Sequence, residues 1–224
     1  TGADFVSIVN NNSAAQNRSY TPLVQTFTGG GTISGAMFTT QINPTSASNS
    51  YAMAVGDLNN DGKPEYITAR YTSSFVQINV NNIQNTTLTS SNFTTSFTIN
   101  VGSNPYSVKI ADMDNDGRPD IVVSNYSNAY ITILKNNYTS GALAAASFTR
   151  VDIPTATNFF GIEVADIDSD GKLDLIGARY TDHNIYIYKN INAPGTITSS
   201  GFAAGVSYFI GTGASPYALT ASDF

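Results

Sequence analysis

Three nine-residue segments hold most of the carboxylates of this chain, with three, four and four of its 16 acidic residues. Each segment has an aspartate, asparagine or glutamate at positions 1, 3, 5 and 9 and a glycine at position 6. The residues at the four positions are Asp57, Asn59, Asp61 and Glu65; Asp112, Asp114, Asp116 and Asp120; and Asp166, Asp168, Asp170 and Asp174. Oxygen ligands spaced this closely are typical of a loop that binds a hard divalent cation.

We expect calcium (Ca2+) in all three segments. Calcium takes about six to eight oxygen ligands, so the backbone carbonyl at position 7 is expected to join the four side chains. That residue is Lys63, Arg118 or Lys172. Without a cation, the crowded carboxylates would repel one another. Magnesium is the weaker competitor because it prefers to keep several waters, and the lack of cysteine argues against zinc or copper.

Two other interpretations of the segments are weaker. An EF-hand needs flanking helices and a glutamate at position 12, where these segments have Thr68, Val123 and Gly177. Ordinary turns that bind no ion would account for the Asp, Asn and Gly residues, but not for three separate clusters of negatively charged side chains. A fourth, interrupted segment would contain only two acids, Asp223 and Asp4, and we expect no tight site there.

The segments recur at a nearly fixed interval. Their first aspartates are 55 and 54 residues apart, and an aromatic residue stands six positions before each, at Tyr51, Tyr106 and Phe160. The C-terminus fits the same frame through Tyr217 and Asp223, and the N-terminal residues continue it, so a fourth repeat is split between the two ends. The repeats cover approximately 50–104, 105–158, 159–214, and 215–224 together with 1–49.

Each repeat is expected to form four antiparallel strands. In the second repeat they are predicted at residues 106–111, 120–126, 129–135 and 148–153, separated by turn-forming residues. A repeated four-stranded unit of this length, almost free of helix-favouring runs, is typical of a β-propeller. The sequence therefore predicts an all-β fold with one domain over residues 1–224.

The predicted propeller has four four-stranded antiparallel blades, and the split blade is closed by the N- and C-terminal strands. Two alternatives stay open. The chain is one stretch of a longer array, or its last strand completes a blade of the next molecule and builds a fibre by strand addition.

The acidic segments and their phase within the repeat resemble the FG-GAP/VCBS repeats of integrin-α-type β-propellers. Phe160-Gly161 and Gly177-Ala178 keep the letters of that motif, while the other repeats have Tyr-Ala or Tyr-Ser at the first pair. The resemblance implies calcium held between the first and second strands of a blade, in a structural role. It also implies extracellular adhesion or carbohydrate-related partners.

Charge and composition narrow the function further. The net charge is −6, and three divalent cations would bring the total near zero, so we expect neither nucleic-acid binding nor membrane-surface binding. No stretch approaches the roughly 20 apolar residues of a transmembrane helix, so direct membrane insertion is not expected either. Because free calcium is plentiful outside cells and scarce in the cytosol, we expect a secreted or cell-surface protein.

We expect no catalysis. The chain has no cysteine, its single histidine, His183, sits in a turn, and the clustered carboxylates are committed to metal. The expected function is a non-catalytic, calcium-stabilised structural or adhesive module whose partners are a surface protein, a glycan or copies of itself. A lectin-like carbohydrate-binding propeller is the alternative, and a polysaccharide-active enzyme is less favoured.

The recurring aromatic residues allow two interpretations. Tyr51, Tyr106, Phe160 and Tyr217 occupy one phase of every repeat, which favours packing between blades over a sugar-binding or peptide-binding surface.

Overall fold

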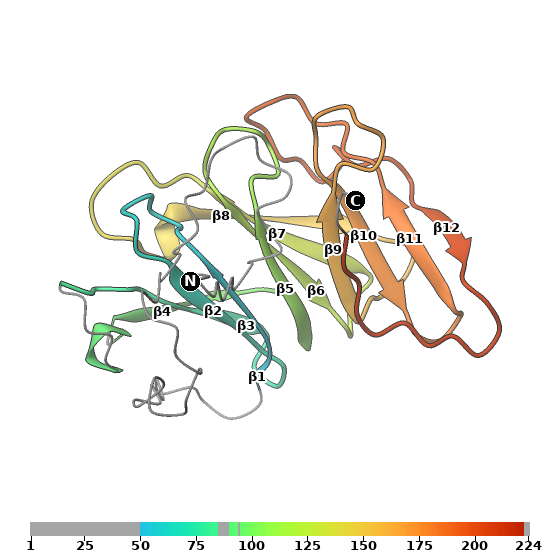
Figure 1. The fold of residues 1–224 in the computed structure, drawn as a ribbon, viewed down its shortest axis with the longest axis horizontal. Helices are drawn as coiled ribbons and strands as arrows, with labels where there is room; N and C mark the ends of the chain where they lie inside the picture. The colour runs from blue at the N-terminus through green and yellow to red at the C-terminus, as the bar shows by residue number, and fades with distance from the viewer. Residues whose placement is uncertain (1–49, 85–89, 94, 222–224) are drawn as a thin grey trace, which may run out of the picture.

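The computed structural model describes residues 50–84, 90–93 and 95–221, and within them the chain folds into three four-stranded antiparallel sheets (Figure 1). Each sheet is built from four consecutive strands. The first contains β1 (Ser50–Gly56), β2 (Glu65–Arg70), β3 (Phe75–Asn79) and β4 (Ser96–Asn100). The second contains β5 (Pro105–Ala111), β6 (Asp120–Asn125), β7 (Tyr130–Asn136) and β8 (Phe148–Pro154). The third contains β9 (Gly161–Ala165), β10 (Asp174–Arg179), β11 (Asn184–Tyr188) and β12 (Val206–Phe209).

The prediction of an all-β fold with four-stranded units is confirmed for these three repeats. In the second repeat each strand ends within one residue of its predicted bounds. The only helical elements in the described residues are the short 3-10 turns η3 (Ser90–Phe93) and η4 (Ala145–Ser147). The local sequence is sufficient here because β-branched runs alternate with turn-forming Asp, Asn and Gly.

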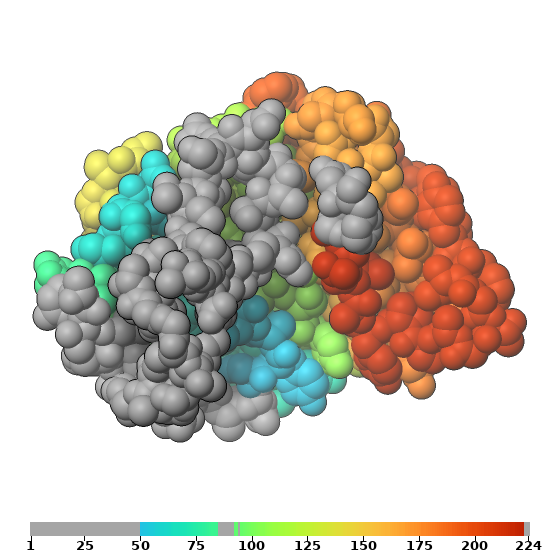
Figure 2. Space-filling model, in the orientation of Figure 1, coloured from blue at the N-terminus to red at the C-terminus, as the bar shows by residue number. Residues whose placement is uncertain are grey.

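The sheets pack face to face in chain order, so that the middle sheet is covered on both sides (Figures 1 and 2). Strand β6 shows how the sequence achieves this. Ile121 and Val123 point into the core shared with the first sheet, while Val122 points into the core shared with the third. Since side chains alternate along a strand, a continuous apolar run serves two interfaces at once.

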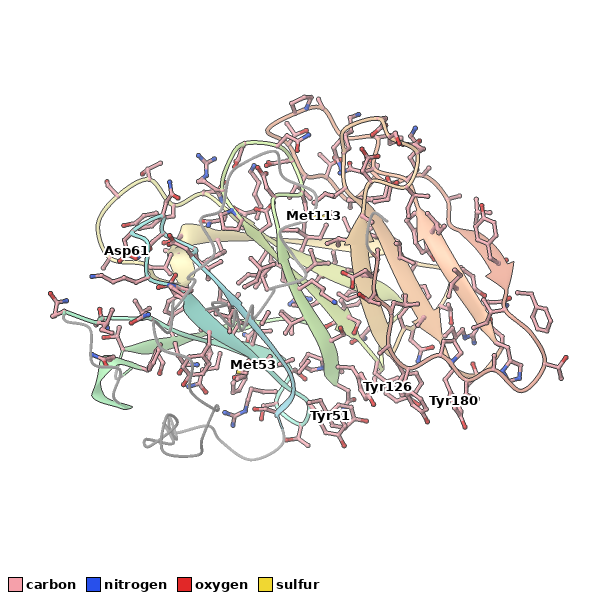
Figure 3. All side chains as sticks on the ribbon, in the orientation of Figure 1. Tyr51, Met53, Asp61, Met113, Tyr126 and Tyr180 are labelled. Atoms are coloured by element: carbon pink, nitrogen blue, oxygen red, sulfur yellow. The ribbon has the colours of Figure 1, made fainter. Side chains whose placement is uncertain are left out.

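The first strands of neighbouring sheets, β1, β5 and β9, lie against one another in that order. The loop from first to second strand therefore falls at the same end of every sheet. The turn from second to third strand falls at the opposite end. In Figure 3, Asp61 of the first such loop lies away from the lower edge, where Tyr51, Tyr126 and Tyr180 gather.

The predicted fourth blade lies mostly outside the described residues, which exclude 1–49 and 222–224. Residues 215–221 are described and form no strand. They nevertheless occupy the place of a next first strand, because a Cβ added at Gly161 of β9 would lie 2.6 Å from the Tyr217 carbonyl oxygen. A β-strand needs hydrogen bonds to a neighbouring strand, and none of the described residues forms such a strand beside this segment.

In the part of the chain that the structure describes, no helix has the length and apolar character needed to cross a membrane.

Candidate metal centres

Each acidic segment forms a loop closed by its own backbone amides. In the second loop, Asp112 accepts hydrogen bonds from the Gly117 N–H (2.7 Å) and the Asp116 N–H (3.1 Å). The other two loops repeat this pattern: Gly62 donates to Asp57 and Gly171 donates to Asp166, each at 2.8 Å. The first aspartate therefore fixes the curl of the loop.

Two residues of each loop adopt a positive φ angle. The glycine at position 6 has φ of +81°, +86° or +85°, in the left-handed region that glycine enters without a Cβ penalty. The residue at position 4 does the same with φ near +60°: Asn60, Asn115 and Ser169. These two reversals curl the loop, and in the second loop they bring the carboxylates at positions 1, 3 and 5 close together.

The acid at position 9 is buried and joins the loop to the third strand. Asp120 accepts from the Met113 N–H with Oδ2 (2.9 Å) and from the Asn136 N–H with Oδ1 (2.8 Å). Asp174 repeats this with Ile167 (3.1 Å) and Asn190 (2.8 Å). Glu65 does so with Leu58 (2.8 Å) and Asn81 (3.4 Å).

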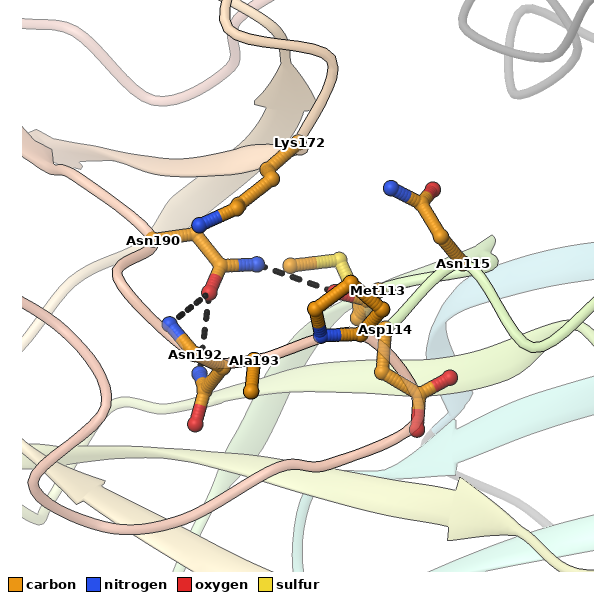
Figure 4. A pocket seen from close by; sticks show the side chains of 8 residues that line it. Met113, Asp114, Asn115, Lys172, Asn190, Asn192 and Ala193 are labelled. Carbon is orange, nitrogen blue, oxygen red and sulfur yellow. Dashed lines mark hydrogen bonds between the residues drawn. The ribbon is translucent and has the colours of Figure 1, made fainter.

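A set of asparagines that the sequence analysis missed connects the second and third blades to the loop of the blade before. Asn136 donates from Nδ2 to the carbonyl of Leu58, in the first loop, at 2.7 Å. Asn190 donates in the same way to Met113, in the second loop, at 2.9 Å (Figure 4). Asn81, Asn136 and Asn190 are spaced 55 and 54 residues apart, the same interval as the aspartates, and that periodicity was the signal that could have identified them.

The three loops differ in how closely they gather their carboxylates. In the second, oxygens of Asp112, Asp114 and Asp116 lie within 4.8 Å of one another. In the third, the group is Asp166, Asp168 and Asp174. Asp57, Asp61 and Glu65 of the first loop, all within the described residues, form no such group.

The remaining predicted ligands lie in the same loops. Asp120 and Asp170 stand outside the two groups. At position 7 the backbone N–H donates to the aspartate at position 5, at 2.9 to 3.0 Å, and the donors are Lys63, Arg118 and Lys172. The ligand set as a whole stays a prediction.

Two lysines, one in the third strand of its sheet and one directly after it, reach the acidic loops. Lys135, in β7, pairs through Nζ with Asp114 and with Asp116 (3.1 Å), and also donates to the Gly195 carbonyl (3.1 Å). Lys189 pairs with Asp168 and with Asp170 (3.2 Å). The corresponding position in the first blade is Val80, and no lysine in the described part of the chain pairs with the first loop.

Burial raises the pKa of several loop carboxyls. Desolvation raises the pKa of Asp120 to about 8 and that of Glu65 to about 7, against the opposing effect of two backbone hydrogen bonds each. The pKa values of Asp112 and Asp174 are raised for the same first reason. A bound cation would favour the ionised forms of these carboxyls.

The donors fit a hard cation. Every side chain at positions 1, 3, 5 and 9 offers oxygen, the loops curl around a common centre, and two of the three gather carboxylates close enough to share one ion. The residues that would hold calcium are those of the three loops.

Three stacked antiparallel sheets, each with an acidic loop between its first two strands, define a bladed repeat protein. The FG-GAP-like repeat family matches this chain twice, over residues 70–123 and 112–177. Residues 70–177 therefore belong to the FG-GAP-like repeats, and this confirms the FG-GAP/VCBS resemblance. Both matches contain the second acidic loop, and the first loop precedes them. No curated protein sequence matches the chain.

Proposed function

We propose that this chain is a non-catalytic extracellular β-propeller module that calcium stabilises at three loops, and that it acts as a structural or adhesive surface protein. The observation that supports this most is the threefold repetition of one loop backbone, with a buried acid at position 9 of each loop and carboxylates gathered within 4.8 Å in two of the three. Calcium bound only to the folded state would stabilise it by about 2.7 kcal/mol per site at a hundredfold excess over Kd.

A structural role suits the position of the loops. The second blade connects to both neighbouring loops. Asn136, the last residue of β7, donates to the first loop, and Asn115 of the second loop donates to the Gly171 carbonyl of the third at 2.9 Å. A cation in the second loop would hold its own first and second strands together. Through those contacts it would also strengthen the blade-to-blade packing.

The same geometry supports a non-catalytic assignment. A general acid or base needs a proton-transfer partner within hydrogen-bond reach of a substrate. Both oxygens of Asp120 already accept backbone N–H groups, and the side chains of Asp114 and Asp116 are engaged by Lys135. Outside the loops, His183 bonds through Nδ1 to the Ala214 carbonyl.

We also propose four blades, with the last one closed by the two ends of the chain. Tyr217 packs on Phe160 at 5.1 Å between ring centroids, just as Phe160 packs on Tyr106 at 5.0 Å. The aromatic repeat therefore continues one step beyond the third sheet. Light scattering across a range of concentrations tests closure: a constant monomer mass supports it, whereas oligomers that grow with concentration favour strand exchange between copies.

Thermal melting tests the calcium proposal. We expect chelation with EDTA to lower the melting temperature, and added calcium to restore it to a greater extent than magnesium. An unchanged melting temperature under chelation would contradict a structural calcium role. The variant Asp152→Asn is the control, because Asp152 is a partly exposed acid outside the loops that pairs with Arg150.

A further inference from the structure

A continuous row of aromatic rings runs across all three blades at the end opposite the acidic loops. Tyr51 and Tyr106 lie at the beginning of first strands, and Phe160 directly precedes β9. Tyr217 continues the same phase in a segment without strand, and Tyr71, Tyr126 and Tyr180 directly follow the second strands. Tyr51, Tyr126 and Tyr180 lie along one edge in Figure 3. Six of the seven rings are tyrosines, which combine an apolar face with a hydroxyl group.

The rings contact one another without a break. Tyr51 stacks on Tyr71 at 4.4 Å and meets Tyr106 at 5.2 Å, which connects the first two blades. Phe160 lies 4.3 Å from Tyr126 and 5.0 Å from Tyr106, which connects the second to the third. The expected packing between blades is therefore present at these positions.

The seven rings of this row do not belong to the hydrophobic core, however. Tyr51 is 56 % exposed, Tyr217 is 48 % exposed and Tyr180 is 36 % exposed, while the other four rings are half-buried. Contiguous exposed aromatic surface on a folded domain usually marks an interaction site. Packing between blades thus accounts for one side of these rings and leaves the other side open.

The backbone under the rings is held in place. Asn104 donates from Nδ2 to the Tyr71 carbonyl at 3.1 Å, and Asn158 donates to the Tyr126 carbonyl. Each asparagine stands two residues before the aromatic residue of the next first strand, so it clamps one ring position to the other. A surface fixed in this way loses little conformational entropy on binding.

The chemistry around the rings is neutral and rich in hydroxyl and amide groups. The turns that follow Tyr71, Tyr126 and Tyr180 contain serine, threonine and asparagine, with Asp182 as their single acid and His183 as their single histidine. Arg70 and Arg179 precede two of these tyrosines, and they donate to Gln77 and pair with Asp182, respectively. Asp182 is already engaged by Arg179 at 3.0 Å and by the Tyr186 hydroxyl at 2.7 Å. The surface therefore presents no uncompensated acid within these turns.

This charge pattern selects among ligands that stack on aromatic rings. Single-stranded nucleic acid needs basic groups that follow its phosphates, and an anionic membrane surface needs clustered lysine or arginine. The three turns contain neither lysine nor arginine. An uncharged saccharide fits, because the C–H face of a sugar ring packs on tyrosine while its hydroxyls bond to Ser, Thr and Asn side chains.

From these observations we infer that the aromatic row binds a neutral oligosaccharide laid across neighbouring blades. The inference deepens the adhesive role proposed above by naming the class of partner. It does not depend on calcium as a direct ligand, because the row and the acidic loops lie at opposite ends of the sheets.

Calorimetric titration of neutral hexasaccharides of glucose, mannose, xylose and N-acetylglucosamine tests the inference, with hexagalacturonate as the acidic comparison. The full chain is kept in calcium throughout. At least one neutral hexasaccharide should bind, and hexagalacturonate should bind at least tenfold more weakly. Binding by none of the neutral hexasaccharides, or preferential binding of hexagalacturonate, would overturn the inference.

Matched variants locate the site. The double variant Tyr51→Ala/Tyr180→Ala should weaken binding at least tenfold, while Tyr51→Phe/Tyr180→Phe, which keeps the rings, should retain most of it. Tyr208→Ala is the control, because Tyr208 is 51 % exposed on β12 and is not one of the seven rings. An equal loss in the control, or none in the double alanine variant, would contradict this site. Melting curves with and without EDTA, recorded on the same samples, show separately whether the calcium proposal holds.

Discussion

The first and second acidic loops share one fold of the backbone and differ in the charge that surrounds it. The second gathers three carboxylates within 4.8 Å and receives the ammonium group of Lys135. The first has Asn59 in place of one aspartate, and the buried Val80 stands where the lysine would be. A calcium ion entering the second loop would have to displace an internal cation, whereas no lysine of the described residues pairs with the first loop. We therefore expect that the loop with more carboxylates need not be the one that binds calcium more tightly.

The third loop follows the second. Lys189 pairs with Asp168 and Asp170, and its side chain is more exposed than that of Lys135, 45 % against 15 %. Since exposed ion pairs contribute little, the competition from Lys189 should be the weaker of the two. We therefore expect calcium affinity to differ among the three loops according to the lysine beside each, and substitution at that position should change the order.

The largest expected effect comes from removing a ligand. Asp116→Asn in the second loop, and separately Asp61→Asn in the first, should each abolish the stabilisation from one calcium, about 2.7 kcal/mol at a hundredfold excess over Kd. Denaturant unfolding with and without calcium measures it. Calcium that stabilises both variants as much as the parent chain would show that these positions are not ligands.

Removing the positive charge of the lysine beside a loop should increase the calcium affinity of that loop. Lys135→Met keeps the length of the side chain and removes its charge, so we expect calcium to bind the second loop about tenfold more tightly, or about 1.4 kcal/mol. Lys189→Met should show a smaller gain in the third loop. A weaker affinity in Lys135→Met would mean that the lysine supports the metal-bound form.

The reciprocal change tests the first loop. Val80→Lys should weaken its calcium affinity several-fold, while Val80→Met, of similar size and uncharged, should leave it near the parent value. Calorimetric titration compares the two variants directly. Equal affinities would show that charge at this position does not govern binding and would remove the basis of the comparison.

The pH dependence of stability should show whether the buried loop carboxyls are protonated when no metal is bound. In metal-free protein the folded pKa values of Asp120, about 8, and Glu65, about 7, lie above those of the unfolded chain, so the folded state binds more protons. Stability should therefore fall as pH rises from about 5 to 8 in EDTA. With calcium bound, the carboxylates are ionised in both states and this decline should disappear. Unfolding measured at several pH values, once in EDTA and once in calcium, checks both expectations.

Much of this architecture could be predicted from the sequence because it is local. The strands of the second repeat follow from β-branched runs broken by turns, and the loops follow from Asp, Asn and Gly at fixed positions. The loop pattern does not reveal that the oxygens of Asp120 bond to Met113 and Asn136 amides, since that depends on the third strand 16 residues away. The engagement of Lys135 was missed for the same reason.

The aromatic residues show a second limit. Their periodicity correctly indicated contacts between blades, but the degree of exposure depends on where a strand ends within the sheet. Tyr51 and Phe160 share a phase in the repeat, yet Tyr51 is 56 % exposed and Phe160 is half-buried. Phe160 has rings of the preceding blade and Tyr217 on either side, whereas in the described part of the chain no preceding blade covers Tyr51.

The most direct test of calcium in the three loops is a calorimetric titration of calcium into the chelator-treated chain. The account predicts three calcium ions per chain, falling to two in Asp116→Asn. No binding heat, or a stoichiometry that this variant leaves unchanged, would contradict it.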